Sequence, residues 1–373
     1  MSKVFSLEAL RAEFGDSLLL RYGHAADPRL VLIDGGPSGV YKDALAPRLA
    51  ELVDARGGSL PIELVVVSHV DKDHVRGILD LSEALLEDED LEQQLEVKGL
   101  WHNAFDDLLG PAVSTELETS DGTQPAEVEA VIAGVAEGEG LRDNADRLNW
   151  TLNPDFDEFV MAPEEGGATV DLGPLRITVV GPRQAEIEKL RVEWAKEQAK
   201  LKKAKGPAAA EIASNIDNSV TNLSSIVCLA ECGGKRMLLT GDARGDKILA
   251  GLEAAGILEP KDSIELDLLK LPHHGSCRNL DQKFFERLRA RHLVISADGE
   301  YDNPDVETLE MLSKARDDDE FTIHLTYSDF KRDVGPKVHG FFDAEKKAGR
   351  KYEVVFRPTD DLSMRIDLLD PPA

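Results

Sequence analysis

The chain has 373 residues, of which 42% are hydrophobic, and its formal net charge is −28. This length permits two domains, and the hydrophobic fraction is enough for a sizeable core. The acidic excess repels polyanions, so it disfavours non-specific binding to nucleic acid but still allows a local basic surface. No apolar stretch reaches 18 residues, and no basic head with an apolar block begins the chain. We therefore predict a protein that neither spans a membrane nor is exported.

The three cysteines, Cys228, Cys232 and Cys277, include no Cys-x-x-Cys pair. An odd and sparse set of this kind does not build a disulfide framework. A reducing cytoplasm is the location that this cysteine usage favours.

The first part of the chain predicts strands, then a helix, then a strand that ends in polar residues. Residues 1–36 indicate two or three short strands with polar turns between them. Residues 41–56 predict a helix, because apolar side chains recur there at helical spacing. Residues 65–74 then form a run of β-branched residues that ends in two histidines and two aspartates.

These four polar residues are His69, Asp71, Asp73 and His74. Alternation along a fraying strand places His69, Asp71 and Asp73 on a common side, while His74 reaches a second point nearby. Such an arrangement suits two adjacent metal ions. A mixture of imidazole and carboxylate favours zinc, manganese or iron over calcium or magnesium, which prefer oxygen alone.

Two segments read as insertions within a single domain that spans residues 1–373. A helix over residues 78–85 leads into the first, residues 87–165, which is acidic and irregular. It is either solvated surface or a binding surface for a protein partner. The second, residues 184–215, holds the main cluster of lysines and arginines. It is either a solvated helix or an arm that recruits a phosphate-bearing substrate.

The later part of the chain repeats the strand-then-polar pattern. Leu238 to Asp242 is an apolar strand that ends in Gly-Asp, and Leu269 to Ser276 is another that ends in His-His-Gly-Ser. The elements expected after these are a helix over 281–291, a strand over 293–296, a helix over 306–315, a strand over 321–326 and a strand-rich tail over 352–369.

Together these motifs resemble the metallo-β-lactamase superfamily. The segment from Ser68 to Gly77 resembles its His-x-His-x-Asp-His signature, in the His-x-Asp-x-Asp-His form of the ComEC-type competence hydrolases. Residues 15–36 resemble the opening hairpin of that fold, and residues 222–226 resemble the Asn-x-Ser-Ser segment of the ComEC-like group. The resemblance implies an α/β protein with the αββα sandwich of this superfamily and two insertions.

The resemblance also implies two divalent metal ions, zinc or manganese, and a set of ligands. The first ion would take His69, Asp71 and His102, although His102 also fits a packed loop. The second would take Asp73, His74 and one residue of the pair His273 and His274. We favour His274, and Asp242 would bridge the two ions.

Further roles follow from the same comparison. We assign catalytic roles to Asp73 and to His273, whose imidazole would hydrogen-bond an oxyanion or protonate a leaving oxygen. Arg76 and Ser276 are expected to bind substrate phosphate, with a structural role as the alternative for Arg76. Asp34 is expected to organise the ligand loop through hydrogen bonds.

We therefore predict a dinuclear metal-dependent hydrolase, a phosphodiesterase or nuclease that uses metal-bound hydroxide on a phosphate-containing substrate, a nucleotide or nucleic acid. Two alternatives stay open. One is a hydrolase of an amide, lactone or thioester bond, and the other is a metal-stabilised interaction module. A small substrate fits the acidic surface better, whereas a nuclease needs the basic segment.

Overall fold

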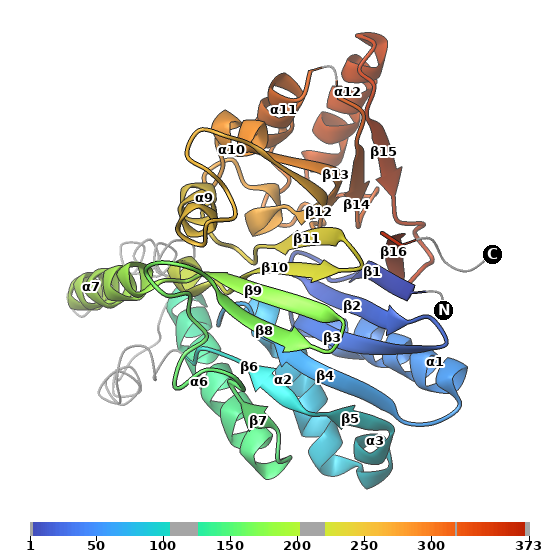
Figure 1. The fold of residues 1–373 in the computed structure, drawn as a ribbon, viewed down its shortest axis with the longest axis vertical. Helices are drawn as coiled ribbons and strands as arrows, with labels where there is room; N and C mark the ends of the chain where they lie inside the picture. The colour runs from blue at the N-terminus through green and yellow to red at the C-terminus, as the bar shows by residue number, and fades with distance from the viewer. Residues whose placement is uncertain (1–2, 105–125, 202–220, 318, 370–373) are drawn as a thin grey trace.

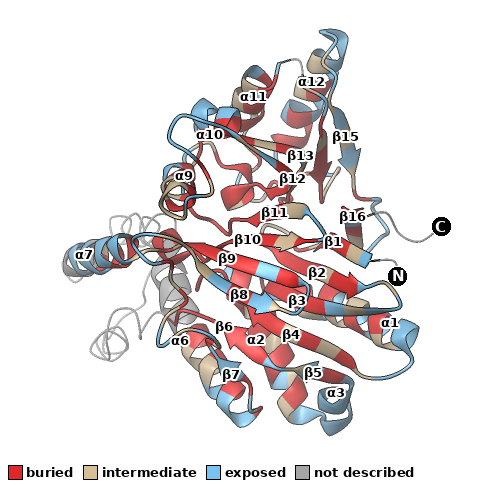
Figure 2. Ribbon diagram, in the orientation of Figure 1, coloured by how far each residue is buried: buried red, intermediate tan, exposed pale blue. Residues whose placement is uncertain are grey.

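The computed structural model describes residues 3–104, 126–201, 221–317 and 319–369. Two eight-stranded sheets pack face to face, and helices cover the outer face of each sheet (Figure 1). Three separate groups of buried apolar side chains match this layering. One lies between the sheets and one lies under the helices on either side, where the ribbon is largely buried (Figure 2).

The first sheet contains the N-terminal strands, and the C-terminal strand closes one of its edges. Its order is β16-β1-β2-β3-β4-β6-β7, and β5 also pairs with β4. The strands are β1 (Lys3–Leu10), β2 (Ser17–His24), β3 (Asp27–Gly35), β4 (Leu60–Val66), β5 (Leu95–Val97), β6 (Gly99–Trp101), β7 (Thr151–Leu152) and β16 (Ser363–Asp367). The pair β3 and β4 and the pair β4 and β6 are parallel.

The second sheet has the order β15-β14-β13-β12-β11-β10-β9-β8. Its strands are β8 (Ala168–Leu172), β9 (Leu175–Gly181), β10 (Val227–Cys232), β11 (Lys235–Leu239), β12 (Ile264–Lys270), β13 (Leu288–Ile295), β14 (Thr322–Leu325) and β15 (Glu353–Phe356). From β11 to β15 every neighbouring pair is parallel, so the carboxyl ends of these strands meet at one edge of the sheet.

The helices fall into two layers. Those on the first sheet are η1 (Tyr41–Leu45), α1 (Ala46–Arg56), α2 (Lys72–Glu87), α3 (Glu89–Gln94) and α6 (Ala126–Arg147). Those on the second are α9 (Gly245–Ala254), α10 (Gln282–Arg287), α11 (Val306–Ala315) and α12 (Val334–Lys347). Near the strand ends lie α7 (Gln184–Leu201), η3 (Thr221–Ser224) and η4 (Pro272–Gly275). None of the helices in the described part of the chain is long and apolar enough to cross a membrane.

The prediction of strands over residues 1–36 and of a helix over residues 41–56 is confirmed. The helix expected over residues 281–291 is wrong in extent, because α10 ends at Arg287 and β13 begins at Leu288. Parallel pairing with β12 along the whole of β13 overrides the local helical pattern. The helix α12 has no counterpart among the predicted elements.

The two segments predicted as insertions contain parts of the sandwich itself. Within residues 87–165, β6 and β7 extend the first sheet and α6 packs against α2. Residues 105–125 of the acidic segment and residues 202–215 of the basic segment lie outside the described residues. The described part of that segment is α7.

Candidate metal centre

The first ligand loop follows β4, which ends at Val66. His69 lies in the loop, whereas Asp73 and His74 belong to the first turn of α2. The amides of His74 and Val75 both donate to the carbonyl of Asp71, so the chain is already helical there. The expectation that these residues alternate along a fraying strand is therefore wrong, although the helical turn still brings Asp73 and His74 to the same centre.

The second ligand loops follow β11 and β12. Asp242 comes just after β11, and the preceding Gly241 has φ of 49°, a left-handed conformation that favours glycine. A Cβ at Gly241 would lie 3.0 Å from the Cβ of Ser68, so this glycine allows the two halves of the site to approach closely. His273 and His274 follow β12 within η4.

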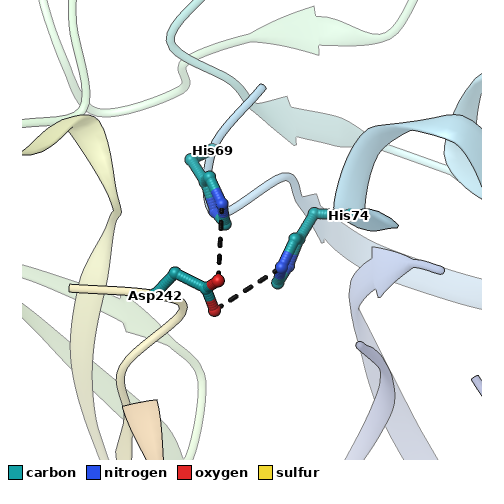
Figure 3. A group of neighbouring side chains, drawn as sticks. All are labelled: His69, His74 and Asp242. Carbon is teal, nitrogen blue, oxygen red and sulfur yellow. Dashed lines mark ion pairs between the residues drawn. The ribbon is translucent and has the colours of Figure 1, made fainter. Parts of the chain in front are cut away.

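Asp242 lies at the centre of the histidines (Figure 3). Its Oδ1 is 3.5 Å from His74 Nε2, and its Oδ2 is 3.6 Å from His274 Nε2. The same Oδ2 is 3.9 Å from the Nε2 atoms of both His69 and His273. One carboxylate from the second sheet thus faces imidazoles of both sheets.

The other two predicted carboxylates, Asp71 and Asp73, lie beside different histidines. Asp71 Oδ2 is 3.2 Å from His69 Nε2. Asp73 Oδ2 is 3.6 Å from His74 Nε2 and 3.4 Å from His274 Nε2. Ligand atoms around a tetrahedral zinc, at bonds of about 2.0–2.1 Å, lie roughly 3.3 Å apart, so these spacings match a metal-binding set.

Among the groups of mutually close side chains that could hold a metal ion are His69, His74 and Asp242, and Asp73, His74 and His274. The Nε2 atoms of the three histidines and Oδ1 of Asp242 are buried, and none has a hydrogen-bond partner among the described residues. Buried polar atoms without partners are costly and call for a ligand or ion. The residues therefore fit divalent cations.

The hydrogen bonds of the Nδ1 atoms leave Nε2 available in three of the histidines. His74 Nδ1 lies 2.9 Å from Asp34 Oδ2, and His274 Nδ1 lies 2.8 Å from the carbonyl of Ser296. Both partners only accept, so Nδ1 carries the proton and Nε2 keeps its lone pair. The expected role of Asp34 is thus confirmed.

His69 obtains the same tautomer through Ser68. The Ser68 hydroxyl donates to Asp34 Oδ2 at 2.7 Å, so at its 3.0 Å contact with His69 Nδ1 it accepts a hydrogen bond. Asp34 therefore orients both His69 and His74, because the serine relays its effect.

His273 differs from its neighbour His274. Its Nδ1 lies 3.1 Å from the side-chain amide nitrogen of Asn222, which donates to it. This bond leaves the proton of the neutral ring on Nε2, which faces Asp242. His273 is suited to donate a hydrogen bond, and His274 is suited to bind a metal.

The buried charges shift one another. Burial disfavours the charged form of His74, but the carboxylates of Asp73, Asp242 and Asp34 outweigh it and hold the pKa well above its usual value. Burial likewise opposes charge on His274, but nearby carboxylates, Asp242 foremost, raise its pKa. The pKa of Asp242 is held well below its usual range because these histidines outweigh its burial. Without a metal, His74 and His274 therefore favour their protonated forms beside the carboxylates, and a bound metal ion would displace the Nε2 protons.

The remaining predicted residues lie at the margins of this centre. His102 follows β6, and its Nε2 is 3.3 Å from the carbonyl of Gly138 in α6, so its role as a ligand stays a prediction. Arg76 forms ion pairs with Asp80, Glu83 and Glu137. A substrate phosphate would have to displace those carboxylates.

Ser276 is buried directly after η4, and its amide donates to the carbonyl of His273 at 2.9 Å. This bond closes the turn that carries the two histidines. The amide is therefore already engaged, and only the Ser276 hydroxyl could serve the predicted phosphate contact, which stays a prediction.

Two buried charges without a predicted role lie beneath the site. Lys270 Nζ is 2.6 Å from Asp16 Oδ2, and both side chains are 1% exposed. The other Asp16 oxygen is 3.7 Å from His274 Nδ1. This ion pair joins the start of β2 to the end of β12 and so connects the two sheets. The sequence signal is Lys270 itself, a cation within the apolar run 268–271.

No family model matches the chain. The chain is similar to ComE operon protein 3 of Bacillus subtilis (strain 168), with 31% identity over 121 residues, which are 30% of this chain and 14% of that protein. Among solved structures, the metallo-beta-lactamase fold protein YhfI from Bacillus subtilis matches over 97% of this chain and 99% of its own. The identity to YhfI is 12% and the TM-score is 0.42.

The layered arrangement, the ligand loops at the strand ends and the match to ComE operon protein 3 agree with the motifs in the sequence. The predicted αββα layering is confirmed by the two packed sheets and their outer helices, and the predicted resemblance agrees with the match to ComE operon protein 3. The chain is thus an α/β protein with two packed sheets between helical layers, and over 121 residues it is similar to ComE operon protein 3.

Proposed function

We propose that this protein is a dinuclear metal-dependent hydrolase of phosphodiesters. The observation that carries the proposal is the convergence of three buried imidazoles and a shared carboxylate, Asp242, whose unsatisfied atoms face one another. His69 and Asp71 would hold one ion and Asp73, His74 and His274 the other, with Asp242 shared between them. His102 remains the candidate for a further ligand. A pair of zinc or manganese ions, when bound, lowers the pKa of water towards neutrality and neutralises charge on attacking and leaving oxygens.

The protein's own side chains add orientation and a hydrogen-bond donor. Asn222 holds His273 with its Nε2 proton directed at the centre, so His273 would donate to an oxygen of the substrate. Burial lowers the pKa of His273, which keeps the ring neutral and its single Nε2 proton available. Asp34 fixes the two imidazoles of the first loop and removes their rotational freedom.

Two features support a phosphate substrate over a carboxylic bond. Asp71 gives the first site a harder and more anionic ligand than a second histidine would, which favours manganese and phosphate oxygens. The helix α7 packs against η3, which carries Asn222. Its exposed cations Lys189, Arg191 and Lys196 therefore lie on an element that borders the site. They alternate with glutamates along the helix, and an anionic substrate in this acidic protein would gain from the cations among them.

The proposal is tested with protein loaded with Mn²⁺ or Zn²⁺ and given bis(p-nitrophenyl) phosphate, single-stranded DNA and cyclic dinucleotides. We expect metal-dependent cleavage that falls by at least about 100-fold in Asp242→Ala, because partners of the ligands alone are typically worth 10- to 100-fold. The matched control is Asp246→Ala, which removes an exposed carboxylate of the same segment and should keep full activity.

Tight binding of two metal ions without cleavage of any phosphodiester would reject the proposal and favour amides, lactones or thioesters as substrates.

We also propose that the protein works in a reducing cytoplasm, because all three cysteines are free.

A further inference from the structure

The most exposed of the large apolar side chains in the described ranges is Tyr301, at 65%. The other three, Leu152, Val192 and Val355, lie on β7, α7 and β15. Tyr301 instead belongs to the loop between β13 and α11, which packs on the histidine turn, since the amide of Asp305 donates to the carbonyl of Gly275 at 3.2 Å. A single exposed ring is ordinary by itself, but Tyr301 lies on a loop that contacts the turn carrying His273 and His274.

Hydrogen bonds fix the loop that presents Tyr301. The amide of Lys331 donates to the carbonyl of Asp298, and the amide of Glu300 donates to the Asp298 carboxylate at 2.9 Å. Lys331 Nζ adds an ion pair to the same carboxylate at 2.9 Å. The backbone immediately before Tyr301 is therefore pre-organised.

The ring of Tyr301 meets Phe14 edge to face, with centroids 5.0 Å apart and an interplanar angle of 83°. Phe14 comes from the loop between β1 and β2, which contacts both halves of the metal centre. The amide of Asp16 donates to the carbonyl of Asp73 at 3.3 Å, and the Ser296 hydroxyl donates to the carbonyl of Gly15 at 2.7 Å. The aromatic pair thus lies at the rim of the centre, where two loops meet.

The charges around Tyr301 are mutually paired. Glu300 binds Lys331 and Arg332, and Arg332 also binds Asp302. This surface offers a flat ring and little net charge, so it suits a planar uncharged group and leaves the phosphate to the metal centre. Aromatic side chains bind nucleobases in this way, because every base has a stacking face.

We propose that Phe14 and Tyr301 form a stacking platform for a nucleobase next to the phosphodiester at the metal centre. This inference rests on the proposed function and narrows its substrate class to base-bearing diesters. Tyr301 supplies the exposed face, and Phe14 sets the angle of the ring. Stacking of one base on such a ring changes affinity by roughly 5- to 100-fold.

The test compares a thymidine dinucleotide with the same dinucleotide lacking its bases, in wild type, Tyr301→Ala, Tyr301→Phe and the control Val355→Ala. We expect Tyr301→Ala to raise KM for the base-bearing substrate by about 5- to 100-fold. The baseless substrate should be unaffected. Tyr301→Phe keeps the ring and should behave as wild type, as should Val355→Ala.

Equal losses on both substrates would assign Tyr301 a structural role and overturn the platform, and so would no change on either. If wild-type protein cleaves neither dinucleotide, equilibrium binding to the metal-loaded protein decides the platform, while the substrates named above decide the proposed function separately. Equal affinities of the two dinucleotides for wild type would then reject it, whereas tighter binding of the base-bearing one that Tyr301→Ala abolishes would support it.

Discussion

The two sheets hold their parts of the metal centre by different means. In the first sheet, a side-chain carboxylate orients the ligand residues. Asp34 accepts from the amide and hydroxyl of Ser68, both at 2.7 Å, and from His74, and Ser68 accepts from His69. A single buried residue, Asp34, therefore fixes the orientation of two imidazoles and of the loop between them.

In the second sheet the main chain takes this role. His273 and His274 have φ of 49° and 54°, left-handed values that non-glycine residues rarely adopt. The amide of His273 donates to the carbonyl of Gly241, and the carbonyl of Ser296 fixes the ring of His274. Such a conformation costs on the order of 1–3 kcal/mol per residue and persists only where surrounding contacts enforce it.

This difference predicts which kind of substitution disrupts each half of the site. Ligands held by a carboxylate are sensitive to one polar substitution, whereas ligands held by the main chain are sensitive to changes of backbone conformation. The ion pair of Asp16 and Lys270 is the point at which the two arrangements meet, because it joins the sheets below His274.

The largest expected effect is the loss of that ion pair. Lys270→Met leaves the Asp16 carboxylate buried without a cation, which costs about 3–5 kcal/mol of unfolding free energy. Urea denaturation measures it. The double variant Asp16→Asn with Lys270→Met removes both charges and should recover most of the loss. A double variant as unstable as Lys270→Met would show that the pairing of charges is not what stabilises the junction.

Next comes the carboxylate that orients the first loop. Asp34→Asn places an amide against His74 and Ser68, so it removes the acceptor that fixes both ring tautomers. We expect the affinity for zinc to fall about 10- to 100-fold, measured by competition with a chromophoric chelator. Asp27→Ala, an exposed carboxylate at the other end of β3, is the control. Unchanged affinity in Asp34→Asn would mean that the loop holds its histidines without this network.

The raised pKa values of His74 and His274 predict how metal binding depends on pH. In the metal-free protein their protonated forms add stability below about pH 6.5, and this stability is lost as the pH rises through the raised pKa values. Metal binding needs neutral imidazoles, so affinity should rise about tenfold per pH unit for each proton displaced. Chelator competition between pH 6 and 8 measures it, and a flat profile would contradict the prediction.

Much of the site followed from local sequence because its ligands stand at the ends of apolar runs. The last three residues of strands 60–66 and 264–270 are buried on both faces, so their polar successors emerge at a sheet edge. What local pattern could not reveal depends on contacts between distant segments. The partners Asp16 and Lys270 meet only when the sheets pack, and the tautomers that separate His273 from His274 depend on Asn222 and on a main-chain carbonyl.

The same limit explains the misplaced element boundaries. The segment after Gln282 carries a helical pattern, yet β13 begins at Leu288 because pairing with β12 supplies hydrogen bonds that a continued helix would forgo. Likewise Asp73 and His74 lie in a helix because the carbonyl of Asp71 accepts two amides.

The smallest expected effect tests the half of the site that the main chain holds. Gly275 has φ of 84°, and an added Cβ would lie 3.0 Å from the Cβ of Pro304. Gly57, at the end of α1, has φ of 72° with nothing within 4 Å of such a Cβ. Alanine at either position should lose about 1 kcal/mol of unfolding free energy, because both glycines are left-handed.

Only Gly275→Ala should also weaken metal binding, since the contact with Pro304 displaces the turn that carries His273 and His274. Thermal unfolding of the metal-free proteins and chelator competition separate the two effects. If Gly57→Ala and Gly275→Ala lose the same stability and both keep wild-type affinity, the backbone of the turn does not set the position of His274. The hydrogen bond from His274 Nδ1 to the Ser296 carbonyl would then be what holds this ring in place.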